Sequence, residues 1–203
     1  MSNKELIPEN TRGKEVNLEE SVSLPTTAAA ADRFKLACER LLFPQGWRKL
    51  TGKLSAVFEV MGDGDQPVSR PVKEGDYIRI NIPGPGPGVG DGYDWVQVSL
   101  LTSAGNDDQQ ELGMKLMPCD NPRSKENEPA HFFKPGASSS FVVRLKDKEV
   151  LSNYYGRNEV VNNETGHVTD NIRNTMIGAG ALAGLSELQW STLIKAFLDE
   201  EKD

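Results

Sequence analysis

Segments in which apolar and polar residues alternate fill the middle of this chain and constrain its fold more than any other feature. They cover residues 54–60, 78–82, 96–100, 112–116, 141–145 and 150–154. Because successive side chains of a strand point to opposite faces, such alternation is typical of strands with one buried face. Clusters of Gly, Asp and Asn separate the segments, and nothing between residues 54 and 155 has the length and period of a helix. The pattern predicts about six antiparallel strands in a β-barrel or a strongly bent sheet.

Helical periodicity lies on either side of these segments. Residues 28–42 are good helix formers with one apolar stripe, and Thr26 or Thr27 precedes them as a capping residue. Near the C-terminus, residues 169–183 and the segment after the capping box at 186–189 also have apolar residues at helical spacing. We therefore expect an α+β protein, with an N-terminal helix and two C-terminal helices packed on the sheet.

The first 25 residues look different from the rest of the chain. They are polar, with isolated apolar residues and no sustained period. Such a segment has little apolar area to repay the entropy of ordering. The sequence predicts a disordered or loosely attached arm over residues 1–25, dispensable for folding. It is followed by a single domain over 26–203, with a β-rich core at 54–156 and the C-terminal helices within 169–201.

Composition excludes several classes of protein. The formal net charge is −7, whereas a nucleic-acid binder normally carries a basic face. The N-terminus has no signal-peptide core, and the longest nearly apolar run is too short to cross a membrane. The two cysteines are far apart in sequence and indicate no disulfide framework. We expect a soluble, cytoplasmic protein that binds neither nucleic acid nor membrane.

A run rich in Pro and Gly, residues 83–92, lies between two predicted strands and leads into Tyr93, Asp94 and Trp95. Proline removes backbone donors and glycine allows positive φ, so this run forms neither helix nor ladder. A phosphate-binding loop needs free N–H groups and a following helix, and here a strand follows. The run therefore predicts a rigid connection, either purely structural or presenting these three residues as a contact surface for a ligand or protein.

Two further clusters are candidate sites. Arg157, Asn158 and Glu159 follow a predicted strand and offer a cation, an amide and a carboxylate for a polar ligand, or Glu159 as a general base. The alternative is a turn in which Arg157 and Glu159 pair with each other or with neighbours and Asn158 is left-handed. His131 stands before two phenylalanines, without the spacing of a metal site. The sequence predicts neither metal nor cofactor.

Three functions remain open at this point. The leading hypothesis is a non-enzymatic binding or adaptor protein that contacts a protein partner through the Pro/Gly-rich loop, with a small-molecule ligand also possible. The second is a small-molecule enzyme, such as a hydrolase, that brings His131, Asp94, Arg157 and Glu159 into one cleft. The third is a structural subunit that docks into an assembly through its C-terminal helices.

Overall fold

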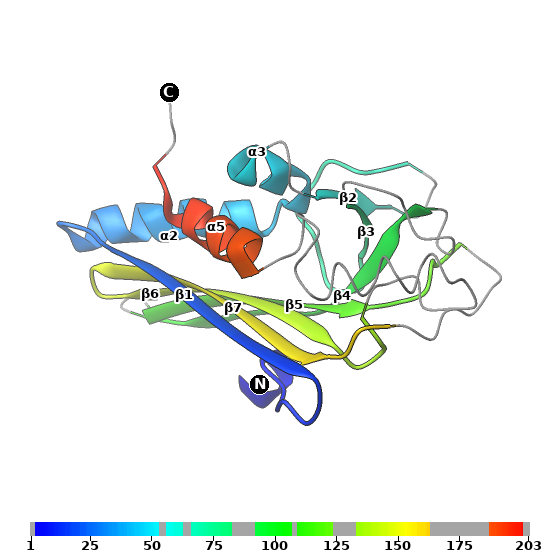
Figure 1. Ribbon diagram of the computed structural model, residues 1–203. Helices are drawn as coiled ribbons and strands as arrows, with labels where there is room; N and C mark the ends of the chain where they lie inside the picture. Colours follow the sequence, from blue (N-terminus) through cyan, green and yellow to red (C-terminus); the bar gives the residue numbers. More distant parts are fainter. Residues whose placement is uncertain are drawn as a thin grey trace.

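A computed structural model describes residues 3–52, 56–62, 66–82, 92–106, 109–123, 133–162 and 187–200. It shows one antiparallel sheet with helices packed mainly on one side, which we call the helix face (Figure 1). The helices are α1 (Asn3–Leu6), α2 (Thr27–Leu41), α3 (Trp47–Thr51) and α5 (Glu187–Leu198), with a short 3₁₀ helix, η1 (Pro44–Gly46), before α3. The predicted α+β class and antiparallel sheet are confirmed.

The sheet has seven strands in the order β1-β7-β6-β5-β4-β3-β2. Their bounds are β1 (Lys14–Ser23), β2 (Val57–Met61), β3 (Tyr77–Asn81), β4 (Asp94–Gly105), β5 (Gln109–Pro118), β6 (Ser138–Lys146) and β7 (Glu149–Glu159). All six predicted strands are present, and β1 is added at one edge. Among the described residues no pairing joins β1 to β2, so the sheet is open there and closure into a barrel is not observed.

The alternation of the sequence gives the helix face its core. In β6 and β7, Phe141 and Tyr154 lie opposite each other in the ladder and both point toward the helices. Trp47, only 1% exposed, lies at the centre of this core. Its ring centroid is 5.0 Å from that of Phe58, 5.1 Å from Phe141 and 5.9 Å from Phe197. These contacts connect α3, the sheet and α5 through one aromatic cluster.

Helix α2 begins where the sequence predicted, and it holds the C-terminal end of α5. The Thr26 side chain caps α2 by accepting a hydrogen bond from the Ala29 amide at 3.1 Å. Arg40 of α2 donates to the carbonyl oxygens of Ala196, at 2.8 Å, and Asp199, at 2.6 Å. Arg33 donates to the carbonyl oxygen of Leu198. Two guanidinium groups thus satisfy the last carbonyls of α5, where the helix dipole favours cations.

Of the two predicted C-terminal helices, α5 is present. The expected helix at 169–183 and the capping-box residue Ser186 lie outside the described residues. The layout of the helices therefore differs from the prediction, because the short helix α3 was not expected and packs beside α5.

The N-terminal segment departs most clearly from expectation, because residues 14–23 form β1 instead of part of a loose arm. Its register with β7 runs from Lys14↔Glu159 to Ser23↔Glu149. Val16 of this strand is buried, at 5% exposure, and Leu18 and Val22 on the same face are half-buried against the core. Glu20 lies between these two on that face and accepts a hydrogen bond from Ser191 of α5, so it interrupts the apolar alternation, and this is why the sequence did not reveal the strand. The domain division itself stays a prediction.

Residues before β1 cross the opposite face of the sheet (Figure 1). Leu6 of α1 is only 3% exposed and lies over Gly113 of β5, where a Cβ atom would overlap its side chain. The Ser140 hydroxyl donates to the Leu6 carbonyl oxygen at 2.5 Å. This contact gives the first residues of the described chain a defined place on the fold.

A truncation series tests the role of the N-terminal segment. Removing residues 1–12 deletes the Leu6 contact and should cost about 2–3 kcal/mol of unfolding free energy, the value typical of losing one buried leucine. Removing residues 1–24 also deletes β1 and exposes the edge of β7, so cooperative thermal unfolding should be lost. If the longer truncation unfolds cooperatively at the temperature of the full chain, β1 is the loose arm that the sequence predicted.

Candidate functional site

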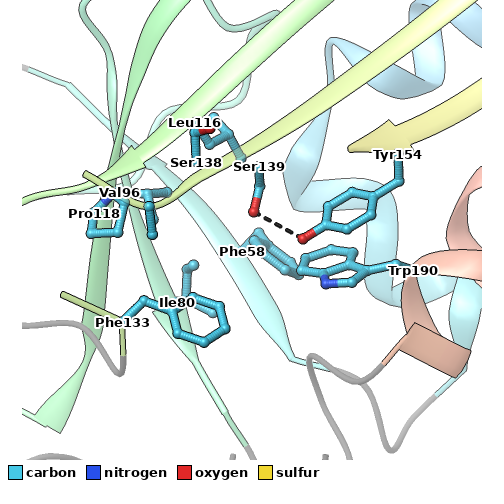
Figure 2. Close-up of a pocket in the computed structure, with 11 residues that line it drawn as sticks. Phe58, Ile80, Val96, Leu116, Pro118, Phe133, Ser138, Ser139, Tyr154 and Trp190 are labelled. Atoms are coloured by element: carbon cyan, nitrogen blue, oxygen red, sulfur yellow. Dashed lines mark hydrogen bonds between the residues drawn. The ribbon is translucent and has the colours of Figure 1, made fainter. Parts of the chain in front are cut away.

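A small cavity lies on the helix face between the sheet and the first turn of α5 (Figure 2). Its volume is about 30 Å³, room for about two water molecules. Its walls come from six strands, from α5 and from the segment before β6. The lining residues are Phe58, Ile80, Val96, Leu116, Pro118, Phe133, Ala137, Ser138, Ser139, Tyr154 and Trp190. The walls are therefore mostly apolar and aromatic, with a few hydroxyl groups.

Trp190 of α5 closes the cavity on the helix side. Its ring stacks on Tyr154 with the centroids 5.0 Å apart and the planes 17° from parallel. It also meets Phe141 edge-on, at 5.4 Å between centroids. Figure 2 shows the indole lying against the Tyr154 ring beside Phe58. One half-buried side chain of α5 thus separates the cavity from the helix layer.

A chain of three polar side chains lies at the Tyr154 end of the cavity. The Ser139 and Tyr154 hydroxyl oxygens are 3.1 Å apart (Figure 2). The Tyr154 hydroxyl also donates to Oε1 of Glu159 at 3.2 Å. The Glu159 carboxylate fills the space above Gly156, where a Cβ atom would lie 2.9 Å from Cδ of Glu159. Glycine at this position therefore lets the carboxylate approach Tyr154.

Burial determines the protonation states of Tyr154 and Glu159. It raises the pKa of Tyr154 well above its ordinary value, and the nearby Glu159 carboxylate raises it further. Burial also raises the pKa of Glu159, although the hydrogen bond from Tyr154 and the positive charge of Lys14 lower it in part. Tyr154 therefore stays protonated at neutral pH and donates a hydrogen bond to Glu159.

Arg157 does not face the cavity but connects β7 to β1. It is 7% exposed, and its guanidinium group donates to the carbonyl oxygen of Val16 at 2.9 Å and to Oδ1 of Asn17 at 2.7 Å. Glu15 forms an ion pair with it at 3.5 Å. These partners all lie on β1, so the described contacts of Arg157 fit the structural alternative that the sequence left open.

Asn158 holds the segment that precedes β1. Its backbone is left-handed, with φ at 54°, as the turn alternative expected. Its side-chain oxygen Oδ1 accepts hydrogen bonds from the backbone amides of Thr11, at 2.8 Å, and Arg12, at 3.2 Å. Its backbone amide donates to Oδ1 of Asn10 at 2.7 Å. Of the three residues in the predicted 157–159 cluster, only Glu159 reaches the cavity, through Tyr154.

The other predicted site residues lie elsewhere. Tyr93 is half-buried under the Arg79 guanidinium group, 4.6 Å from its ring centroid. Asp94 is 0% exposed, and Trp95 is 2% exposed in a second apolar cluster with Met61. None of these residues lines the cavity. The Pro/Gly residues 83–91 and His131 lie outside the described residues, so the contact role of that loop stays a prediction.

Sequence reasoning missed Ser139, Tyr154 and Trp190 as a group. Each was visible separately: Tyr154 in an alternating strand, Ser139 in phase with Phe141, and Trp190 on the stripe of α5. Their meeting depends on the register Ser139↔Gly156 and Phe141↔Tyr154 between β6 and β7, and on the position of α5 over this pair. The register of this hairpin follows from its two-residue turn at Asp147 and Lys148, but the position of α5 over the pair leaves no local signal, so the sequence did not bring Trp190 to it.

Other chemistry finds no support within the described residues. No group of three or more His, Cys, Asp or Glu side chains there could hold a metal ion. Cys38 and Cys119 are both free thiols, and burial raises the pKa of each to about 12, so neither is a ready nucleophile. None of the helices in the described ranges is both long and apolar enough for a membrane span.

No protein-family model and no curated protein matches this chain in sequence. Similar solved structures include the aromatase/cyclase Zhui from Streptomyces sp. R1128, with 11% identity, 91% of this chain and 92% of that chain covered, and a TM-score of 0.43. Another is ginseng major latex-like protein 151 from Panax ginseng, with 13% identity, coverage of 83% and 95%, and a TM-score of 0.38. At these values the likeness assigns neither a family nor an activity to this chain.

The raised pKa of Glu159 predicts a pH-dependent cost to stability. Below the ordinary carboxyl pKa, Glu159 is protonated in both states and costs nothing. As pH rises from there through the raised folded pKa, the unfolded chain loses its proton first, so stability falls. Glu159→Gln should therefore raise the melting temperature by a few degrees at neutral pH and leave it unchanged near pH 4.

The control for this measurement is Glu149→Gln. Glu149 is a carboxylate at the other end of the same strand and is not among the groups that shift the pKa of Glu159. Melting temperatures of both variants and the parent chain, taken by circular dichroism across this pH range, make the comparison. A Glu159→Gln variant that is less stable than the parent at neutral pH would show that the charged carboxylate stabilises the fold.

Proposed function

We propose that this protein binds a small, mainly apolar molecule between its sheet and helix α5, without transforming it. The observation that carries this proposal is the cavity itself, which has aromatic and aliphatic walls and one hydrogen-bonded polar end. Ligand sites in proteins commonly combine apolar walls with a few fixed polar groups. Such walls favour an apolar ring system that carries a single polar substituent.

The cavity is too small for such a ligand unless Trp190 moves, and the anchoring of α5 allows this. The C-terminal end of the helix is fixed by Arg33 and Arg40. The first turns carry weaker polar contacts, namely an exposed ion pair between Lys14 and Glu187 and a 3.3 Å hydrogen bond from Ser191 to Glu20. Displacing the Trp190 end while the other end stays fixed would enlarge the cavity.

The alternatives have less support from the described residues. An active site would need Asp94 or His131 beside Glu159, but Asp94 does not line the cavity and His131 lies outside the described ranges. Docking through α5 would need an exposed apolar face, whereas Leu193, Ile194 and Phe197 are buried against the fold. Binding of a protein partner by the Pro/Gly-rich loop stays a separate proposal.

Tetralin, a rigid apolar two-ring molecule, provides a direct test. Binding to the native state alone should raise the melting temperature in proportion to ligand concentration. Trp190→Ala should bind tetralin about tenfold more tightly, because the space of the indole becomes available without displacing the helix. Ala137→Leu, which places a larger side chain against the cavity, should bind it about tenfold more weakly.

Leu188→Ala is the matched control on the same helix. Leu188 is 77% exposed, so its loss removes apolar surface from α5 without changing the cavity. Titration calorimetry on the four proteins gives the affinities, and near-ultraviolet circular dichroism shows that each is folded. If tetralin binds the parent chain and the Ala137→Leu and Trp190→Ala variants equally well, the ligand lies elsewhere and the proposal is wrong.

A further inference from the structure

We propose that the chain Ser139–Tyr154–Glu159 makes this cavity selective for ligands whose polar group donates a hydrogen bond, so that an alcohol or phenol binds in preference to a ketone of the same shape. The inference rests on the proposed binding function and adds the chemical class of the ligand. It follows from the order of the three side chains and from how many protons each can give.

The donor and acceptor of each hydrogen bond in the series Ser139–Tyr154–Glu159 follow from the charge of Glu159. An ionised carboxylate has no proton, so Glu159 can only accept. The Tyr154 hydroxyl has one proton and uses it in the hydrogen bond that it donates to Glu159 at 3.2 Å. The hydrogen bond between Ser139 and Tyr154 then needs its proton from Ser139, which donates to the phenol oxygen at 3.1 Å. Both hydroxyl protons are thus committed away from the cavity.

The Ser139 and Tyr154 hydroxyl oxygens can therefore only accept a hydrogen bond from a ligand. Ser139 and Tyr154 both line the cavity, and with their protons committed each offers only oxygen lone pairs. The third lining hydroxyl belongs to Ser138, which is one residue out of phase with Ser139 on β6, so its side chain lies toward the opposite face of the sheet. Among the described residues, Ser139 has no other side-chain partner that could draw its proton elsewhere. A ligand hydroxyl can donate to the Ser139 oxygen, whereas a ketone oxygen in the same place would face lone pairs and stay unpaired.

The protonation of Glu159 would reverse this order. A protonated Glu159 donates to Tyr154, Tyr154 then donates to Ser139, and the Ser139 proton becomes free for a ligand oxygen. Within the described ranges, the groups that act on the charge of Glu159 are Tyr154 and Arg157 of β7, Lys14 of β1 and Glu187 of α5. Because burial raises the pKa of Glu159, the reversal should begin at a higher pH than the protonation of an exposed carboxyl group.

The size of the preference follows from the cost of an unpaired polar group. A buried carbonyl that loses its hydrogen bond to water without gaining another weakens binding by roughly tenfold or more. The alcohol keeps one good hydrogen bond. The ratio of the alcohol affinity to the ketone affinity therefore shows whether the Ser139 hydroxyl accepts or donates in the cavity. An unsubstituted ring system has no polar group and serves as the reference for the apolar walls.

Four probes of nearly equal shape make this test: tetralin, α-tetralone and the two enantiomers of α-tetralol. Calorimetry at neutral pH should show one enantiomer of the alcohol binding about tenfold more tightly than the ketone. At a pH low enough to protonate Glu159, the affinity for the ketone should rise and the ratio should fall toward one. The affinity for tetralin should not change with pH.

Tyr154→Phe breaks the chain while keeping the ring that stacks on Trp190. In this variant the Ser139 hydroxyl can donate or accept, so the alcohol-to-ketone ratio should fall to within about twofold at every pH. Ser152→Ala is the matched control, because Ser152 is a buried hydroxyl of the same strand that does not line the cavity. Its ratio should equal that of the parent chain.

The outcomes separate this inference from the function on which it rests. If tetralin binds but the parent chain shows no preference, or if Tyr154→Phe keeps the parent preference, the inference is wrong and the binding function stands. If none of the four probes binds, the proposed function fails, and this inference fails with it. An unchanged affinity for tetralin in Tyr154→Phe shows that the variant is folded and its cavity intact.

Discussion

The burial of Tyr154 is the interaction on which the arrangement of this protein depends. Its ring lies between Phe141 of β6, at 5.2 Å between centroids, and Trp190 of α5, at 5.0 Å. These contacts place the first turn of α5 over the sheet. Because a buried hydroxyl needs partners, the same residue draws Ser139 and Glu159 into one hydrogen-bonded chain. The position of the helix, the cavity beneath it and its polar end thus follow from one side chain.

Most of the fold could be predicted from the sequence, because a buried face imposes a period that local reading detects. The six alternating segments, the helix after Thr26 and the apolar stripe of α5 are all present in the structure. Strand β1 was not predicted because its apolar face is short, with Val16 buried and Leu18 and Val22 half-buried, and because Glu20 interrupts the alternation on that face. Closure of the sheet is a matter of which edges meet, and periodicity does not encode it.

The site could be predicted only in part, and for a related reason. Glu159 was identified because a carboxylate just after a strand stands out, but its neighbours Arg157 and Asn158 use their polar groups to hold residues 10–17. A cluster of polar residues at a strand end thus serves the attachment of another segment as readily as it serves a ligand. Ser139 and Trp190 have ordinary neighbours in sequence and become a site only through strand register and helix placement.

Of the three hydrogen-bonded side chains Ser139, Tyr154 and Glu159, only Glu159 has no explanation in the stability of the fold. Burial raises its pKa, so at neutral pH its charge is held in the folded state at a cost that a glutamine would avoid. Gly156 adds to this cost, since the glycine needed to admit the carboxylate loses more backbone entropy on folding than any other residue. Where local rules are broken at two coupled positions without a gain in stability, function is the common reason. The gain we assign here is the fixed direction of the Tyr154 proton, which gives an otherwise apolar cavity a defined hydrogen-bonding character.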